Sequence, residues 1–149
     1  MIDDPKAGSL PTIVAWIPML DSDERPAAEA MTSTFADKLV PQFWDGERLL
    51  GKEVSRSLGV DATHASWDIY LFYPPEAEWT DAGLPPAAKV IVQAMGVVIG
   101  AKGTLPPKGD QSRVPEWAQG RADVVGEQPE LGALLTAIAV PFAVQYQRR

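Results

Sequence analysis

The sequence of 149 residues contains no cysteine. This absence excludes disulfide bonds, thiolate nucleophiles, cysteine-ligated zinc and iron–sulfur clusters, because each of these needs a thiol or thiolate. Thiol–disulfide oxidoreductase activity is therefore excluded. Whether the chain catalyses some other reaction stays open at this point.

Basic residues are few and scattered. The chain carries 13 Lys and Arg residues against 20 Asp and Glu residues, which gives a formal net charge of −7. The only adjacent basic pair is Arg148–Arg149. Because an acidic surface repels phosphate backbones, we do not expect nucleic acid as a partner.

The sequence also lacks a long apolar run. The longest one, residues 131–144, is shorter than the roughly 20 residues that a membrane-spanning helix needs. Residues 1–5 are acidic and show neither the basic nor the apolar region of a secretory signal. We therefore expect a soluble, cytoplasmic protein without a membrane partner. The length predicts one domain over residues 1–149.

The first segments predict a strand followed by a helix. Residues 12–20 form a continuous apolar run, which is typical of a strand covered on both faces, and Pro18 is expected to end its pairing near Ile17. Residues 24–37 predict a helix with Asp23 as its N-cap. Its expected buried stripe recurs every four residues, at Ala27, Met31 and Phe35.

The same order then repeats. Residues 38–44 predict a second strand. Leu50, Val54 and Leu58 mark a second helix, with Gly59 as the glycine that follows its C-terminus. Residues 66–73 alternate apolar side chains on both faces and predict a third strand.

The second half gives weaker signals. Residues 85–99 open on two prolines that suit a helix start, yet their β-branched residues equally suit a strand. Residues 100–129 are rich in Gly, Pro and charge and predict an irregular excursion pinned by Trp117. Residues 130–147 predict a C-terminal helix with a broad apolar face.

A family resemblance rests on the order of elements over residues 12–73 and on three short motifs. The motifs are Trp16-x-Pro18-Met19-Leu20, Phe43-Trp44-Asp45 and Trp67-Asp68-x-Tyr70. They resemble a cysteine-less bacterial branch of the thioredoxin-like superfamily. The resemblance implies an α/β fold with three layers, α/β/α, around a mixed central sheet, with the C-terminal helix added to a core of about residues 11–99. It also implies that the redox cysteines would fall near Met19, so the redox centre is missing.

Three aspartates suggest one candidate site. If the strands at 12–18 and 39–44 are parallel, Asp21, Asp23 and Asp45 emerge at the same edge of the sheet, where ligands bind in open α/β sheets. Carboxylates there could hold Mg²⁺. Helix caps and turns recruit aspartate for their own reasons, and we favour that structural explanation.

The single histidine suggests a second candidate. His64 precedes Ser66 and Asp68, and these three residue types form a nucleophilic relay where they meet in space. No glycine-rich nucleophile elbow accompanies them. A surface histidine beside a strand start is the favoured interpretation.

Tryptophans suggest a third candidate. Trp16, Trp44, Trp67 and Trp79 lie at strand ends or in adjacent loops, where their rings could stack a planar ligand. Packing into the core is the favoured alternative. Taken together, the residues with a candidate binding role are Trp16, Met19, Asp21, Asp23, Trp44, Asp45, His64 and Asp68.

The leading hypothesis is a redox-inactive, thioredoxin-like module that binds a protein or a small molecule, with no cofactor. One alternative is a small Mg²⁺-dependent or acid/base enzyme that uses the strand-end aspartates. The other is a homodimer that associates through the C-terminal helix at residues 130–147.

Overall fold

The computed structural model describes residues 8–38 and 40–148 and divides the chain into two compact units. The unit that we call the aromatic unit comprises Pro11–Trp67 and Glu78–Pro86. The other, the meander unit, comprises the segment up to Leu10, Asp68–Ala77 and Ala87–Arg149. The acidic start of the sequence, Leu39 and Arg149 lie outside the described residues.

Helices and strands are mixed, as the α/β prediction requires, but the described strands form two sheets. β1 (Val14–Trp16) pairs in parallel with β2 (Gln42–Trp44). A separate sheet is antiparallel throughout, in the order β3 (Ile69–Phe72), β4 (Lys89–Ala94), β5 (Val97–Ala101) and β6 (Ala122–Glu127). The prediction of one mixed central sheet is therefore wrong. The strand predicted third, which corresponds to β3, pairs with β4 in the β-branched segment that follows it in the chain.

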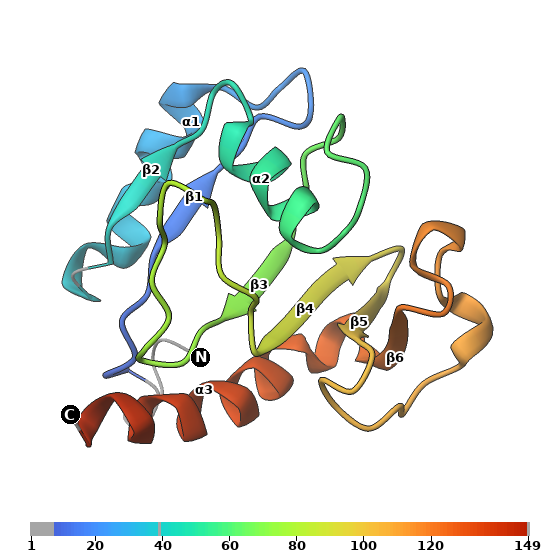
Figure 1. Ribbon diagram of the computed structural model, residues 1–149. Coiled ribbons are helices and arrows are strands. Elements are labelled where there is room, and N and C mark those ends of the chain that lie inside the picture. The colour runs from blue at the N-terminus through green and yellow to red at the C-terminus, as the bar shows by residue number, and fades with distance from the viewer. Residues whose placement is uncertain (1–7, 39, 149) are drawn as a thin grey trace. The chain divides into compact units, whose positions relative to one another are not determined.

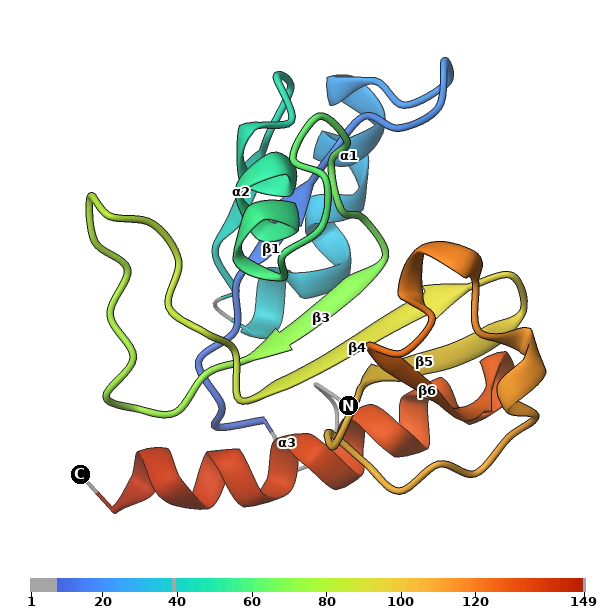
Figure 2. The same ribbon diagram turned by 45° about the vertical axis from the view of Figure 1, so that its right-hand side comes forward.

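The aromatic unit is a strand–helix–strand–helix arrangement. α1 (Arg25–Met31) runs on as a 3₁₀ helix, Thr32–Lys38, and connects β1 to β2, while α2 (Leu49–Ser57) follows β2. Figures 1 and 2 show α1 and α2 on opposite sides of β1. The predicted helical segment at 24–37 is confirmed, although its second half is a 3₁₀ helix. The first two strands pair in parallel, which is the condition under which Asp21, Asp23 and Asp45 were expected at one edge of the sheet.

A glycine sets how closely α2 lies against the sheet. A Cβ atom at Gly51 would lie 2.7 Å from Cβ of Ala65 and 3.1 Å from Cδ1 of Ile17. The helix ends as predicted at Gly59, whose φ of 68° lets the N–H of Val60 reach back to the carbonyl of Ser55 at 2.9 Å.

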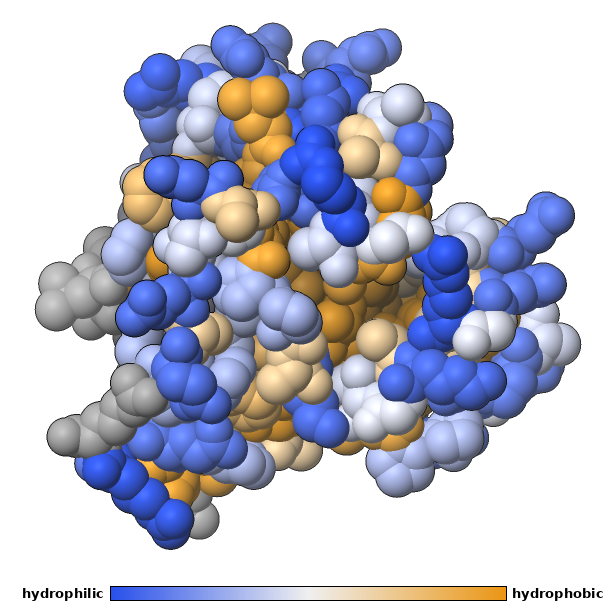
Figure 3. Space-filling view, viewed as in Figure 1, coloured by the Kyte–Doolittle hydropathy of each residue, from blue (hydrophilic) through white to orange (hydrophobic). Residues whose placement is uncertain are grey.

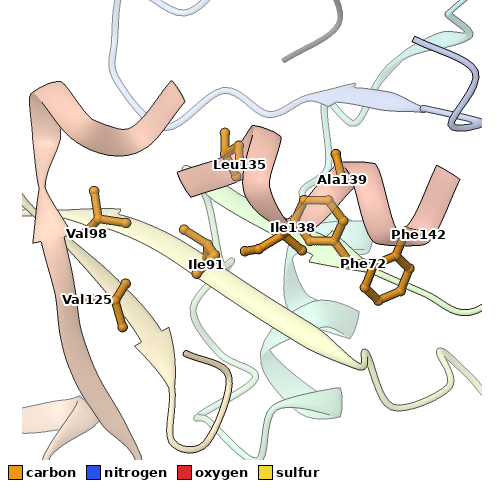
Figure 4. Close-up of a cluster of buried hydrophobic side chains, with 8 residues drawn as sticks. All are labelled: Phe72, Ile91, Val98, Val125, Leu135, Ile138, Ala139 and Phe142. Carbon is orange, nitrogen blue, oxygen red and sulfur yellow. The ribbon is translucent and has the colours of Figure 1, made fainter. Parts of the chain in front are cut away.

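The meander unit packs α3 (Leu131–Gln147) on one face of its sheet, and this helix matches the predicted one at 130–147. Its strands are β3 (Ile69–Phe72), β4 (Lys89–Ala94), β5 (Val97–Ala101) and β6 (Ala122–Glu127). Figure 4 shows the buried cluster between sheet and helix, with the ring centroids of Phe72 and Phe142 5.6 Å apart. The cluster consists of Phe72, Ile91, Val98, Val125, Leu135, Ile138, Ala139 and Phe142.

The segment at 85–99 is strand, not helix. β4 and β5 form a hairpin whose two turn residues, Met95 and Gly96, have φ values of 49° and 78°. Two successive positive φ values are the signature of a tight turn that suits the twist of a hairpin. The prolines at 85 and 86 precede the strand and start no helix.

The excursion at 100–129 is more ordered than predicted. It contains two short 3₁₀ helices, Gln111–Arg113 and Glu116–Ala118, and then β6. Val114 and Ala118 cover the second face of the sheet, against Val97, Ile99 and Val124. Trp117 does not pin the segment, because the residue is 56% exposed.

The outer edge of β6 is closed by a side chain. The amide of Gln111 donates from Nε2 to the carbonyl of Val124 at 3.0 Å and accepts from its N–H at 3.0 Å. The same carbonyl also accepts from the backbone N–H of Lys108 at 3.0 Å, so a side-chain amide and the preceding loop together take the place of a neighbouring strand. An edge covered in this way cannot pair with a strand of another chain at that point.

One helix of the described residues, Gln128–Gln147, is long and apolar enough to cross a membrane by length and composition alone. The expectation from residues 131–144 did not include the preceding turn, Gln128–Glu130, which extends the helix to 20 residues. A core helix of a soluble protein passes the same test, and the inner face of α3 lies in the buried cluster.

Two glycine substitutions test the packing of α2. Gly51→Ala is expected to destabilise the aromatic unit by about 1–3 kcal/mol, because the new methyl group overlaps Ala65 and Ile17. Gly132→Ala is the control, because nothing lies within 4 Å of a Cβ at this position in α3. The control is expected to stabilise by about 0.5–1 kcal/mol. Urea unfolding measures both, and equal midpoints for the two variants would contradict the close packing.

Candidate functional site: an aromatic groove between the parallel strands and the first helix

The parallel register brings two tryptophans together. Trp16 of β1 is the partner of Trp44 of β2, and residues at the same level of neighbouring parallel strands point to the same side of the sheet. Both residues are partly buried. Of the four tryptophans predicted at strand ends, these two meet. Trp67 and Trp79 are about half exposed, at 50% and 52%, and do not line the groove that Trp16 and Trp44 form.

A glutamine fixes one of the two indoles. Gln42 lies two residues before Trp44 and so on the same face of β2. Its Oε1 accepts from the indole N–H of Trp16 at 3.1 Å, and its Nε2 donates to the carbonyl of Thr32 at 3.2 Å. The sheet and the end of α1 are thereby tied together through one side chain.

The first helix turns polar residues toward the tryptophans. Arg25, Ala28, Glu29 and Thr32 share one face of the helical segment and line the groove, and Ala28 is the buried one. The predicted buried stripe is wrong at two of its three positions. Ala27 is exposed and Met31 is 46% exposed, while Phe35 is partly buried.

Together these residues form an open groove of about 130 Å³. It is lined by Trp16, Arg25, Ala28, Glu29, Thr32, Gln42, Phe43 and Trp44. Arg25 donates from Nε to Oε1 of Glu29 at 2.8 Å across one helical turn, and both side chains are mostly exposed. A single engaged nitrogen leaves the four terminal N–H groups of the guanidinium for another acceptor.

The indole N–H of Trp44 has no hydrogen-bond partner among the described residues. Its nitrogen is not one of the fully buried polar atoms that lack a partner. The indole lies over Gly46, where a Cβ would be 2.7 Å from Nε1. The groove therefore offers an aromatic surface whose second indole N–H has no partner among the described residues.

The aspartates predicted beside the tryptophans serve the backbone. Asp23 accepts from the N–H groups of Met19 and Leu20 at 2.8 Å and 2.7 Å. These bonds lower its pKa, with Leu20 making the larger contribution. Asp23 is not the helix cap, since that position is Glu24, whose side chain makes no capping bond. Met19 thus contributes its backbone to a turn and does not line the groove.

Asp45 has a similar local role. Its two carboxylate oxygens accept from the N–H groups of Leu49 and Gly51, at 2.8 Å and 3.2 Å, and so hold the start of α2. Asp21 is exposed. In the described part of the chain, no three carboxylate or imidazole groups gather as a metal site would require. The geometry gives the magnesium hypothesis no support.

The histidine relay is not assembled. Oγ of Ser66 pairs with Oγ of Ser55 at 2.8 Å, while the ring of His64 meets Thr63 at 3.0 Å and Asp61 at 3.5 Å. The hydroxyl and the imidazole thus have different partners. Asp68 belongs to the meander unit, and burial raises its pKa.

The predicted site residues include two of the eight that line the groove, Trp16 and Trp44. The four polar residues that sequence reasoning missed are Arg25, Glu29, Thr32 and Gln42, and it also missed Ala28 and Phe43. The available signal was spacing, because Arg25, Glu29 and Thr32 share one face of the predicted helix at 24–37. Periodicity assigns the inward face of a helix that covers a sheet to its apolar residues.

No protein-family model, curated protein or solved structure matches this chain. The function must therefore be argued from the groove itself.

The role of Asp23 predicts a pH-dependent loss of stability. Because its pKa is lowered in the folded chain, the carboxylate stabilises the fold at pH values above the ordinary aspartate range. This contribution disappears as the pH falls through the lowered pKa. Asp23→Ala is expected to reduce the urea midpoint at pH 7, by an amount that shrinks toward pH 3. Asp21→Ala is the control and is expected to change little, whereas a pH-independent deficit in Asp23→Ala would contradict the assignment.

Proposed function

We propose that this chain is a binding module that takes a planar, apolar group against the indoles of Trp16 and Trp44. The observation that carries the proposal is the groove itself, in which two in-register indoles lie beside polar residues of α1. Ala28 is the buried residue of this helix, while Arg25 and Glu29 line the groove and stay mostly exposed. An aromatic surface beside an exposed ion pair suits a ligand that has both an apolar and a polar part.

Binding is favoured over catalysis because the groove lacks a paired acid and base. Among its lining residues Glu29 alone carries a carboxylate, and Arg25 engages it. General acid–base catalysis needs a group within hydrogen-bond reach of the reacting proton and in the right protonation state. The hydroxyl of Thr32 donates to the backbone carbonyl of Glu29 at 2.7 Å, and the lining residues include no imidazole that could act as its base.

A thioredoxin-like origin remains our proposal for the aromatic unit alone. The order β1–α1–β2–α2 and the parallel pairing support it. The separate sheet of the meander unit argues against extending it to β3.

Ligand-observed NMR with indole as the probe tests the binding proposal. Indole is expected to bind the wild-type protein weakly, with a Kd on the order of 1 mM for so small a ligand. Trp44→Leu is expected to lose this binding because half of the aromatic surface is removed. Trp117→Leu is the control, since Trp117 lies in the meander unit and is exposed. Equal binding to both variants, or none to the wild-type protein, would reject the groove as the site.

A second proposed role is self-association through α3. The helix carries no charged side chain over its 17 residues, and only 28% of its most apolar window is buried. Its outward residues include Gly132, Ala133, Ala137, Pro141 and Val144. Figure 3 shows hydrophobic residues reaching the surface between hydrophilic ones. Two copies that each carry a net charge of −7 could meet along such a stripe without apposing like charges. An antiparallel arrangement would also bring Arg148 of one copy toward Glu130 of the other.

Light scattering after gel filtration tests this role. The wild-type protein is expected to shift toward a dimer as its concentration rises, whereas Ala137→Glu is expected to stay monomeric, because it places a charge in the stripe. Lys52→Glu, on α2, changes charge away from the stripe and is the control. A wild-type monomer at every concentration would exclude the dimer and leave the groove unaffected.

A further inference from the structure

Some polar groups around the groove already have a hydrogen-bond partner, and others could still bind a ligand. Both ends of the Gln42 amide are occupied, and the indole N–H of Trp16 is occupied by Gln42. The groups that remain are mainly donors: the indole N–H of Trp44 and the terminal N–H groups of Arg25. The second oxygen of Glu29 is the one side-chain carboxylate acceptor left among the lining residues.

The arrangement of Arg25 favours an anionic acceptor. Glu29 engages Nε from one side, so the outer edge of the guanidinium, with its two terminal nitrogens, remains free. This edge matches the two oxygens of a carboxylate. Glu29 also restrains the side chain, so less rotamer freedom is lost when a ligand binds.

The size of the groove limits the apolar part of the ligand. A volume of about 130 Å³ that is open on one side accommodates one ring system, not an extended chain. The two indoles provide stacking faces for a planar ring, and such contacts contribute about 0.5–1.5 kcal/mol beyond their buried area.

From these observations we infer that the groove recognises a small aromatic carboxylate, with its ring against Trp16 and Trp44 and its carboxylate on Arg25. This inference rests on the proposed binding function and specifies the ligand class. The Trp44 indole N–H supplies a second donor to the same carboxylate or to a polar atom of the ring.

Three probes with one ring and different charges test the inference by titration calorimetry. They are indole-3-acetate, indole-3-acetamide and tryptamine, which are anionic, neutral and cationic at pH 7. The acetate is expected to bind about five- to tenfold more tightly than the amide, since its hydrogen bonds to Arg25 are charge-assisted. Tryptamine is expected to bind most weakly. Raising the salt concentration should reduce the preference for the acetate, because the Arg25 side chain is exposed.

Matched variants of the ion pair identify its contribution. Arg25→Gln is expected to bind the acetate and the amide equally while keeping its affinity for the amide. Glu29→Gln keeps an acceptor for Arg25 and removes the negative charge, so it is expected to bind the acetate more tightly than the wild-type protein does. Both positions are exposed on α1, and unchanged urea midpoints would verify that the variants fold.

The outcomes separate the inference from the function on which it rests. Equal affinities for the three probes, or an acetate preference that survives Arg25→Gln, would overturn the carboxylate specificity and leave the groove as a binding site. Tightest binding of tryptamine, lost in Glu29→Gln, would overturn it in favour of a cationic ligand. If none of the probes binds the wild-type protein, both the inference and the proposed function fail.

Discussion

The parallel pairing of β1 with β2 is the constraint on which the groove depends. Its register sets Trp16 beside Trp44, with the strands roughly 4.8 Å apart. A shift by one residue would send one indole to the opposite face, because side chains alternate along a strand. The same register places Gln42 where it reaches both Trp16 and the end of α1. A three-residue strand pair thus fixes both rings and the polar link between them.

Local signals could be predicted from the sequence, whereas strand partners could not. Gly59 ends α2 because a glycine in the left-handed conformation caps a helix irrespective of the rest of the fold. The pairing of β3 depends on a distant segment, and the turn that would have revealed that segment is Met95–Gly96. Asn-Gly is the usual signal of such a turn, and methionine conceals it. β6 was missed because its outer edge is completed by the side chain of Gln111, a contact that no periodicity encodes.

The candidate site was predictable in its aromatic part only. Trp16 and Trp44 follow from strand positions that the apolar runs had located. The acidic residues beside them were misassigned as ligand groups because Asp23 and Asp45 both end in backbone hydrogen bonds. The polar residues that line the groove from the first helical segment, Arg25, Glu29 and Thr32, were not predicted. Periodicity analysis assumes that the apolar residues of a helix face inward, whereas Met31 is exposed and these polar residues line the groove.

The aromatic unit buries few apolar side chains, and this limits its stability. Of the buried apolar residues that the structure describes, the aromatic unit contributes only Ala28 and Val54, whereas the meander unit supplies the rest. Apolar burial is the main favourable term in folding, at about 25 cal/mol per Å². The aromatic unit therefore has few buried apolar side chains, and two of its four tryptophans, Trp16 and Trp44, flank the groove instead of filling an interior. A ligand seated against Trp16 and Trp44 would bury surface that the unit leaves open. A molecule that binds only the folded state raises the free energy of unfolding, and the increase grows with the logarithm of the ratio of free ligand concentration to Kd. Because the aromatic unit buries few apolar side chains of its own, a ligand in the groove would stabilise this unit by adding the packing that it lacks.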